Sequence, residues 1–165
     1  MQTLAAEEFP TVAQAEQYNA KVTLPQKTLK HLFNMVHFSM AQQDIRYYLN
    51  GLLLVVDGKN VIAVATDGHR LAFCQVATEQ EFPRQEVIIP RKTIIELQRL
   101  LEENDQPVDL EIANNQVKLT FGDIELISKL VEGKFPDYTR VVPKGYKNNF
   151  TIGRDALLRS LQRAA

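Results

Sequence analysis

Short apolar runs alternate with turn-forming residues along most of the chain. Between Arg46 and Cys74, three apolar runs are separated by Asp57-Gly58 and Asp67-Gly68. Asp-Gly pairs adopt positive φ angles at low steric cost and are strong hairpin signals. The pattern therefore predicts a three-stranded antiparallel meander, with strands at 46–56, 60–66 and 70–76.

The first of these strands is apolar on both of its faces. Side chains alternate along a strand, so one face would carry Tyr47, Leu49, Gly51, Leu53 and Val55, and the other Tyr48, Leu52, Leu54 and Val56. One face must cover the core, and an apolar second face then needs a partner. A neighbouring domain and a ligand groove both satisfy that need.

A short strand followed by a proline and an amphipathic helix occurs twice. Residues 20–24 alternate like a strand, and after Pro25 the apolar side chains recur at helical spacing. Residues 86–89 form the second such strand, and a helix is predicted from Arg91 to about Leu101. The inward positions are Leu29, Leu32, Phe33 and Val36 in the first helix, and Ile94, Leu97 and Leu101 in the second.

The second helix is also followed by a predicted meander, with turns at Asn114-Asn115 and Gly122-Asp123. Its strands are expected at 108–113, 116–121 and 124–130. Residues 24–29 correspond to residues 89–94, so each half reads strand, helix, meander. We therefore expect an α+β fold of two half-repeats related by a pseudo-two-fold axis, with helices on one side and antiparallel sheets on the other.

The ends of the chain show a longer period. Glu8-Phe9-Pro10 is echoed 126 residues later by Lys134-Phe135-Pro136. The strand at 22–24 and its helix are echoed by residues 150–152 and the Leu157, Leu158, Leu161 pattern, which predicts a strand at 150–152 followed by a helix. We interpret the chain as one complete domain with pieces of equivalent domains attached. The expected boundaries are 1–19 for the end of a first domain and its linker, 20–142 for the complete middle domain, and 143–165 for a truncated third domain.

The composition excludes several classes of protein. The net charge is −1 and there is one cysteine, so no internal disulfide is possible; Cys74 is predicted to be a buried thiol. The three histidines lack ligand-like spacing, and neither a metal nor a cofactor is expected. No apolar run approaches the roughly 18 residues that span a bilayer, and no signal pattern is present. We expect a soluble cytoplasmic protein with no membrane partner.

No catalytic arrangement is evident. Asp44, Asp57, Asp67 and Asp123 all lie at predicted turns, where Asp is favoured for its bonds to the backbone. No phosphate-cradling loop or nucleophile motif occurs. An enzyme that uses the Asp67–Arg70 turn remains an alternative, but the sequence favours a protein that is not an enzyme.

Five motifs resemble one known family. They are RYYLNG (46–51), ATDGHRLA (65–72), IPRK (89–92), SKL (128–130) and FPDY (135–138), and they resemble the bacterial DNA polymerase III sliding clamp family, the beta subunits. The resemblance implies the middle of three domains, in a subunit that forms a head-to-tail homodimeric ring around duplex DNA. A piece of this kind would itself be a monomer. The implied function is that of a processivity factor.

The resemblance also assigns a DNA-facing surface. Lys27 and Lys30 lie on a helix without acidic residues between Pro25 and Gln43, and Arg91 and Lys92 open the second helix. In the family these helices line the hole, where cations attract phosphates without reading bases. Solvated amphipathic helices are the alternative. Before the first strand, Gln43, Arg46, Tyr47 and Tyr48 combine an amide, a cation and two aromatic rings that could bind and stack DNA bases. By resemblance, Gln43, Tyr47 and Tyr48 are DNA contacts at the ring's edge, although the tyrosines could equally be packing residues.

A peptide-binding groove is the second implied site. By resemblance, its middle-domain wall is formed by Leu49, Thr66, Gly68, His69, Arg70 and Leu71, and its linker side by Pro136, Arg140 and Val141. Gly51 would leave room for the ligand. The implied ligand is a Gln-x-x-Leu-Phe motif from the polymerase III alpha subunit, the clamp loader, other polymerases and repair proteins. A stand-alone peptide-binding adaptor without a DNA role is the alternative function.

Overall fold

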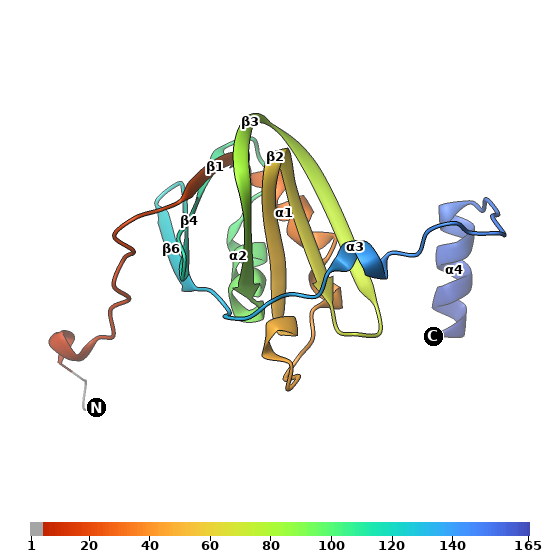
Figure 1. Ribbon diagram of the computed structural model, residues 1–165, viewed down its shortest axis with the longest axis horizontal. Helices are drawn as coiled ribbons and strands as arrows, with labels where there is room; N and C mark the ends of the chain where they lie inside the picture. Colours follow the sequence, from red (N-terminus) through yellow and green to blue (C-terminus); the bar gives the residue numbers. More distant parts are fainter. Residues whose placement is uncertain (1–4) are drawn as a thin grey trace. The chain divides into compact units, whose positions relative to one another are not determined.

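The computed structural model describes residues 5–165, which divide into two compact units with the boundary in the chain between Phe135 and Pro136. The first unit combines two helices with antiparallel sheets, shown in Figure 1. This α+β architecture, with its two strand-helix-meander halves, confirms the predicted fold class.

The second half-repeat contributes most of a four-stranded antiparallel sheet. Its order is β1 (Ala20–Pro25), β4 (Pro107–Ile112), β5 (Gln116–Phe121) and β6 (Ile124–Lys129). Val22 pairs with Leu110, and Leu110 with Leu119, so that buried side chains lie in register across the sheet. Cross-strand apolar neighbours of this kind stabilise a sheet and fix its register.

The other sheet is built from two long strands, β2 (Gly51–Thr66) and β3 (Leu71–Pro90), each of which doubles back on itself (Figure 1). Residues 51–56 of β2 pair with 85–90 of β3, and 60–66 pair with 71–77. The register breaks between Val56 and Asn60, where Gly58 has a φ of 55°. The predicted Asp57-Gly58 turn and the strands that flank it are therefore confirmed.

The predicted start of the first strand at Arg46 is wrong, because the structure has a 3-10 helix, η3 (Tyr47–Leu49), before Gly51. The Leu49 N–H donates to the Arg46 carbonyl at 2.8 Å, and the Asn50 N–H to the Tyr47 carbonyl at 3.0 Å. Tyr47 and Leu49 consequently do not share a strand face with Leu53. From Gly51 onward the alternation holds: Leu52, Leu54 and Val56 enter the main core, while Leu53 and Val55 are buried outside it.

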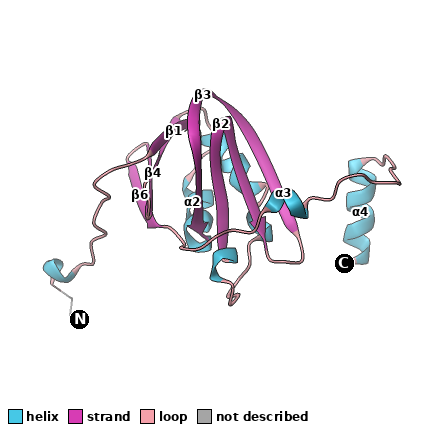
Figure 2. Cartoon of the chain, in the orientation of Figure 1, coloured by secondary structure: helices cyan, strands magenta, loops and turns pink. Residues whose placement is uncertain are grey.

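Both predicted helices are present, and each begins immediately after a proline. Helix α1 (Gln26–Asn34) follows Pro25, and α2 (Arg91–Leu100) follows Pro90. Proline has φ preset for a helix start and its missing N–H is not needed there. The two helices lie on the same side of the sheets (Figure 2) and pack against each other and against the strands. The predicted apolar stripes are buried: Leu29, Leu32, Phe33, Val36, Ile94, Leu97 and Leu101.

Two smaller segments complete the first unit. A 3-10 helix, η2 (His37–Ser39), follows α1, and another, η1 (Ala6–Glu8), lies near the N-terminus.

Cys74 is half-buried, and this burial raises the pKa of its thiol. Among the described residues, no helix is long and apolar enough to cross a membrane.

The second unit contains α3 (Tyr138–Val141) and α4 (Arg154–Ala164). Asp137 caps α3, since its Oδ1 accepts a hydrogen bond from the Thr139 N–H at 3.1 Å. The helix predicted around Leu157–Leu161 is confirmed, but the strand predicted at 150–152 is wrong. A strand needs a neighbour for its backbone groups, and among residues 5–165 no strand pairs with this stretch.

Candidate functional site

The Thr66–Leu71 turn, which we call the groove turn, is held by its own side chains. The Thr66 hydroxyl donates to the Arg70 carbonyl at 2.7 Å and accepts from the Gly68 N–H at 3.1 Å. Asp67 Oδ1 accepts from the N–H groups of His69 and Arg70, at 2.9 and 3.0 Å. Gly68 has a φ of 89°, a conformation that favours glycine. The turn therefore has one well-defined backbone path.

These bonds also define the chemistry of Asp67. Hydrogen bonds from the His69 and Arg70 backbone, followed by the Arg70 guanidinium, lower the pKa of its carboxyl group. A general acid or base works best with a pKa near the ambient pH. An Asp kept ionised by two N–H groups is suited to bracing a turn, and this weighs against the enzyme alternative.

The predicted groove residues of the first unit differ in exposure. Leu49 and Thr66 are buried, with 2% and 8% of their surface exposed, and Leu71 is half-buried. Gly68, His69 and Arg70 are exposed. Leu49 reaches its position from η3 rather than from a strand, and its carbonyl accepts from the Ala41 N–H at 3.0 Å. A ligand at the groove turn could therefore reach Gly68, His69 and Arg70 directly, whereas Leu49 is almost wholly covered by the protein.

Gly51 has a reason of its own to be glycine. A Cβ at this position would lie 2.5 Å from the Ile89 carbonyl oxygen and 2.9 Å from the Ile88 side chain. The missing side chain therefore allows β2 and the last residues of β3 to approach closely. Room for a ligand, the predicted explanation, is not needed to account for this glycine.

The three predicted linker residues belong to the second unit. Pro136, Arg140 and Val141 are all exposed, and Arg140 Nε lies 3.1 Å from Asp137 Oδ2. Arg140 and Val141 are in α3, which begins two residues after Pro136. The stretch therefore presents a cation and an apolar side chain to solvent from one short helix.

The aromatic segment, Asp44–Asn50, carries the predicted base-stacking residues. Tyr47 is exposed and Tyr48 half-buried, and their rings meet edge to face with centroids 5.9 Å apart. Gln43, just before the segment, is exposed and has a φ of 55°. Tyr47 can therefore offer a ring to a ligand, whereas Tyr48 is partly used in packing. The segment also contains Ile45, whose surface is 96% exposed and which the sequence reasoning did not single out.

Arg46, predicted to contact DNA, is already engaged. Its Nε and Nη2 bind the two carboxylate oxygens of Asp44, at 3.0 and 2.8 Å. The same Nη2 lies 3.3 Å from the Asp67 carbonyl oxygen. The structure thus brings the aromatic segment and the groove turn together through this guanidinium, a link that the sequence pattern does not reveal.

The four predicted helix cations fall into two pairs. Lys27 Nζ lies 2.6 Å from Asp105 Oδ1, and Lys30 Nζ lies 4.0 Å from Glu103 Oε1. Arg91 and Lys92 form no ion pair within residues 5–165, although Arg91 Nη1 lies 3.5 Å from the Met40 carbonyl oxygen. The acids that face α1 come from the loop after α2, far away in the sequence. Sequence proximity alone could not have found them.

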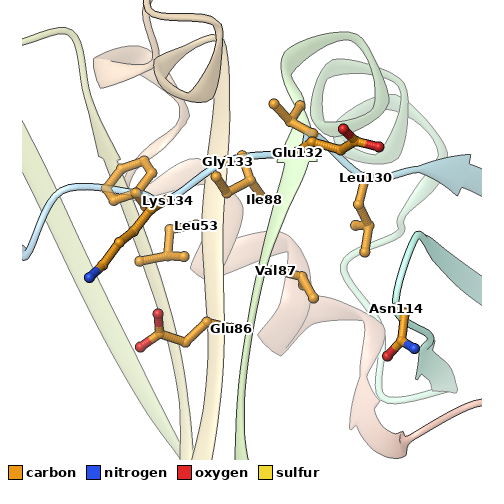
Figure 3. A pocket seen from close by; sticks show the side chains of 11 residues that line it. Leu53, Glu86, Val87, Ile88, Asn114, Leu130, Glu132, Gly133 and Lys134 are labelled. Atoms are coloured by element: carbon orange, nitrogen blue, oxygen red, sulfur yellow. The ribbon is translucent and has the colours of Figure 1, made fainter.

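Two hollows differ in their relation to the predicted residues, since the first is lined by none of them and the second by three, His69, Arg70 and Arg91. Figure 3 shows one of about 340 Å³, where Lys134 and Glu86 lie to one side, Leu53 between them, and Asn114 on the other side. Leu53 belongs to the second apolar face of β2, the one signal in the sequence that pointed here. The other hollow, about 350 Å³, lies beside the groove turn and is lined by Phe38, His69, Arg70 and Arg91 among others.

The halves, the helices on one side and the groove turn define a DNA-clamp domain, and comparison with known proteins agrees. Residues 23–137 match the family model described as the DNA polymerase III beta subunit, central domain. The chain belongs to the DNA polymerase III beta subunit family. It is 45% identical over 165 residues to the beta sliding clamp of Escherichia coli K12 and 43% identical over 168 residues to that of Pseudomonas aeruginosa. Each alignment spans the whole of this chain but only 45% of the length of the relative.

Solved structures show the same relationship. The P. aeruginosa DNA polymerase III beta subunit superposes with a TM-score of 0.83 at 46% identity, covering 86% of this chain and 39% of that one. A sliding clamp from the same organism bound to griselimycin gives 0.86 at 42% identity, covering 97% and 43%. A Eubacterium rectale protein gives 0.88 at 23% identity, covering 98% and 44%, and supports the fold alone.

Proposed function

We propose that this chain is the middle part of a bacterial sliding clamp subunit, a processivity factor that encircles duplex DNA and is not an enzyme. The observation that carries the proposal is the family match across residues 23–137, together with 45% identity along all 165 residues. Because the chain spans less than half of its relatives, the ring itself is inferred. Topological enclosure needs no catalytic group, in keeping with the bracing role of Asp67.

The proposal includes a domain assignment. Residues 1–19 would be the end of a first domain with its linker, 20–142 the complete middle domain, and 143–165 the beginning of a third. The whole subunit would form a cytoplasmic homodimer, and the 165-residue chain alone would be a monomer. The exposed Leu157, Leu158 and Leu161 of α4 support this assignment, because an unpartnered apolar stripe is typical of a helix whose own domain core is elsewhere.

On the DNA side, we propose that Arg91 and Lys92 supply most of the diffuse attraction to phosphates. Their charges are not matched by acids in the described part of the chain, whereas Lys27 and Lys30 face Asp105 and Glu103. Attraction to phosphates is independent of base sequence and falls with salt. Gln43 and Tyr47 would add contacts to bases at the edge of the ring.

On the partner side, we propose that the groove turn and Leu49 form one wall of a peptide groove. Exposed Gly68, His69 and Arg70, together with buried Leu49, would combine backbone and cationic groups with an apolar side chain, as peptide sites require. Pro136, Arg140 and Val141 would complete the linker side. The ligands would be Gln-x-x-Leu-Phe segments of the polymerase III alpha subunit, the clamp loader and other polymerases or repair proteins.

The adaptor alternative, a peptide binder without a DNA role, is favoured by one observation. Two of the four predicted helix cations are paired with carboxylates, which weakens the basic face. Binding of the whole subunit to duplex DNA distinguishes the two functions. An adaptor binds the motif peptide and ignores DNA at every salt concentration.

Charge reversal at Arg70 tests the groove without disturbing the core. Arg70→Glu in the whole subunit should weaken binding of a fluorescein-labelled Gln-x-x-Leu-Phe peptide by about tenfold, measured by fluorescence polarisation. Arg99→Glu is the matched control, since Arg99 is also exposed and paired three residues away with an acid, Glu96. Equal affinities of the two variants would remove the groove turn from the site.

Leu49→Asp is a harsher test of the same groove and should abolish peptide binding. Because Leu49 is buried, this variant must be shown to be folded by its circular dichroism and melting curve. Ile45→Asp makes the same change at a position that is 96% exposed, and peptide binding should survive it. A folded Leu49→Asp protein with unchanged affinity contradicts the assignment of Leu49.

A further inference from the structure

Arg46 is bound to Asp44 in a way that closes the start of the aromatic segment. The Arg46 N–H donates to Asp44 Oδ1 at 2.8 Å, and its guanidinium grips both carboxylate oxygens. These bonds, with the side-chain bond first, lower the pKa of Asp44 to about 2. Bidentate Arg–carboxylate pairs fix geometry as well as charge. The pair is therefore ionised and oriented throughout the neutral range.

Asp44 also holds the far end of the segment through Asn50. The Asp44 N–H donates to Asn50 Oδ1 at 2.9 Å, and Asn50 Nδ2 donates to the Asp44 carbonyl at 2.8 Å. The two ends of the aromatic segment are thereby joined, with Tyr47, Tyr48 and Leu49 between them. Asp44 is therefore bonded to both ends of the segment that carries the tyrosines and Leu49.

The guanidinium of Arg46 then reaches the groove turn. Nη2 lies 3.3 Å from the Asp67 carbonyl oxygen, and a Cβ on Gly68 would lie 3.0 Å from Nη1. Arg46 therefore packs against the backbone of a turn whose next residues, His69 and Arg70, are exposed to a ligand. One side chain connects the two surfaces that we assign to nucleic acid and to peptide.

We propose that Arg46 is a positioning residue that couples the aromatic segment to the groove turn, so that nucleic acid at Tyr47 and a peptide in the groove strengthen each other's binding. The inference rests on the proposed function. A peptide that fixes the turn keeps the Asp67 carbonyl in place for Arg46, and Arg46 in turn keeps Asp44 and the tyrosines in place. Coupling of this kind is reciprocal.

The first test uses the 165-residue chain and needs no peptide. Adding oligothymidylate should shift the backbone amide NMR signals of Tyr47 and Tyr48, and also those of Gly68, His69 and Arg70. In Arg46→Ala the tyrosine shifts should remain and the turn shifts should disappear. Wild-type shifts at the tyrosines without shifts at the turn overturn the coupling. No shift at either place counts against the proposed DNA contact itself, and the inference falls with it.

The second test measures the coupling in the whole subunit. Saturating oligothymidylate should lower the Kd of the wild-type protein for the motif peptide by about fivefold, the lower end of usual coupling strengths. Arg46→Ala should bring the ratio of peptide Kd values, measured without and with saturating oligothymidylate, to about one. Arg46→Lys should do nearly the same, because an ammonium keeps the charge but cannot form the bidentate bond.

Arg84→Ala provides the matched control for the loss of an ion-paired arginine. Arg84 is also bound to two carboxylates, Asp57 and Glu86, and its side chain is 50% exposed against 45% for Arg46. It lies on β3, away from the groove turn, so the fivefold ratio should persist in this variant. A ratio that falls equally in both alanine variants, or that survives in Arg46→Ala, overturns the proposal.

Discussion

The N-termini of α1 and α2 occupy equivalent places in the two half-repeats but differ in their electrostatics. Each helix begins after a proline and carries two cations on its first turns, Lys27 and Lys30 on α1 and Arg91 and Lys92 on α2. The lysines face Asp105 and Glu103, while the second pair has no acidic partner within residues 5–165. The repeat thus preserves the backbone and core, and the charge of the helical face is free to differ between its halves.

Substitutions in the shared core should have the largest effect, a loss of stability, and they test whether both half-repeats contribute equally to the core. Leu32 in α1 and Leu97 in α2 are both fully buried, at 0% exposure. Leu32→Ala and Leu97→Ala should each lower the free energy of unfolding by about 2–5 kcal/mol, through lost burial and the cavity left behind. Chemical denaturation of the 165-residue chain measures both. A negligible loss at one site alone would mean that only one half carries the core.

The charge difference predicts a smaller effect, and here the two helices should differ rather than behave alike. In the whole subunit, Arg91→Glu with Lys92→Glu should weaken binding to duplex DNA by on the order of tenfold and flatten its salt dependence. Lys27→Glu with Lys30→Glu should have a clearly weaker effect, because the lysine charges are already partly offset. Binding titrations at several salt concentrations give both slopes. Equal losses in the two double variants would refute the difference between the helices.

Removing the acids that face α1 should make this helix more like α2 in its attraction to DNA. Glu103→Gln with Asp105→Asn leaves Lys27 and Lys30 without their partners, and DNA affinity should rise about twofold to threefold, a small gain because exposed pairs are weak. Glu79→Gln with Glu81→Gln is the control, since these exposed acids lie on β3. A gain of the same size in the control would show a general charge effect.

The periodic parts of this fold could be predicted from the sequence. The helical stripes through Leu32 and Leu97 and the Asp57-Gly58 turn depend on local spacing and local backbone preference, which the sequence displays directly. The start of the first strand could not be predicted in this way. Tyr47 and Leu49 continue the apolar alternation of the strand, but hydrogen bonds between Asp44 and Asn50 close a turn there instead. The strand predicted at residues 150–152 was wrong for another reason, because a strand requires a partner strand.

The candidate site also has features that the sequence predicts and features that only the structure reveals. The resemblance of the motifs indicated which residues to consider, and the structure shows what they contact. Arg46 is predicted to contact DNA, and the structure shows that its side chain also binds Asp44 and the Asp67 carbonyl oxygen. The two lysines of α1 lie beside acids that follow α2. Such contacts join residues distant in sequence or compete for one side chain, and neither kind leaves a periodic signal.

The central claim is that the whole subunit holds DNA by enclosing it. The most direct measurement is retention of the loaded subunit on circular duplex DNA before and after the circle is cut once. The claim predicts stable retention on the closed circle and rapid loss on linearisation, because a ring without tight contacts slides off a free end. Equal retention on closed and cut DNA would contradict it.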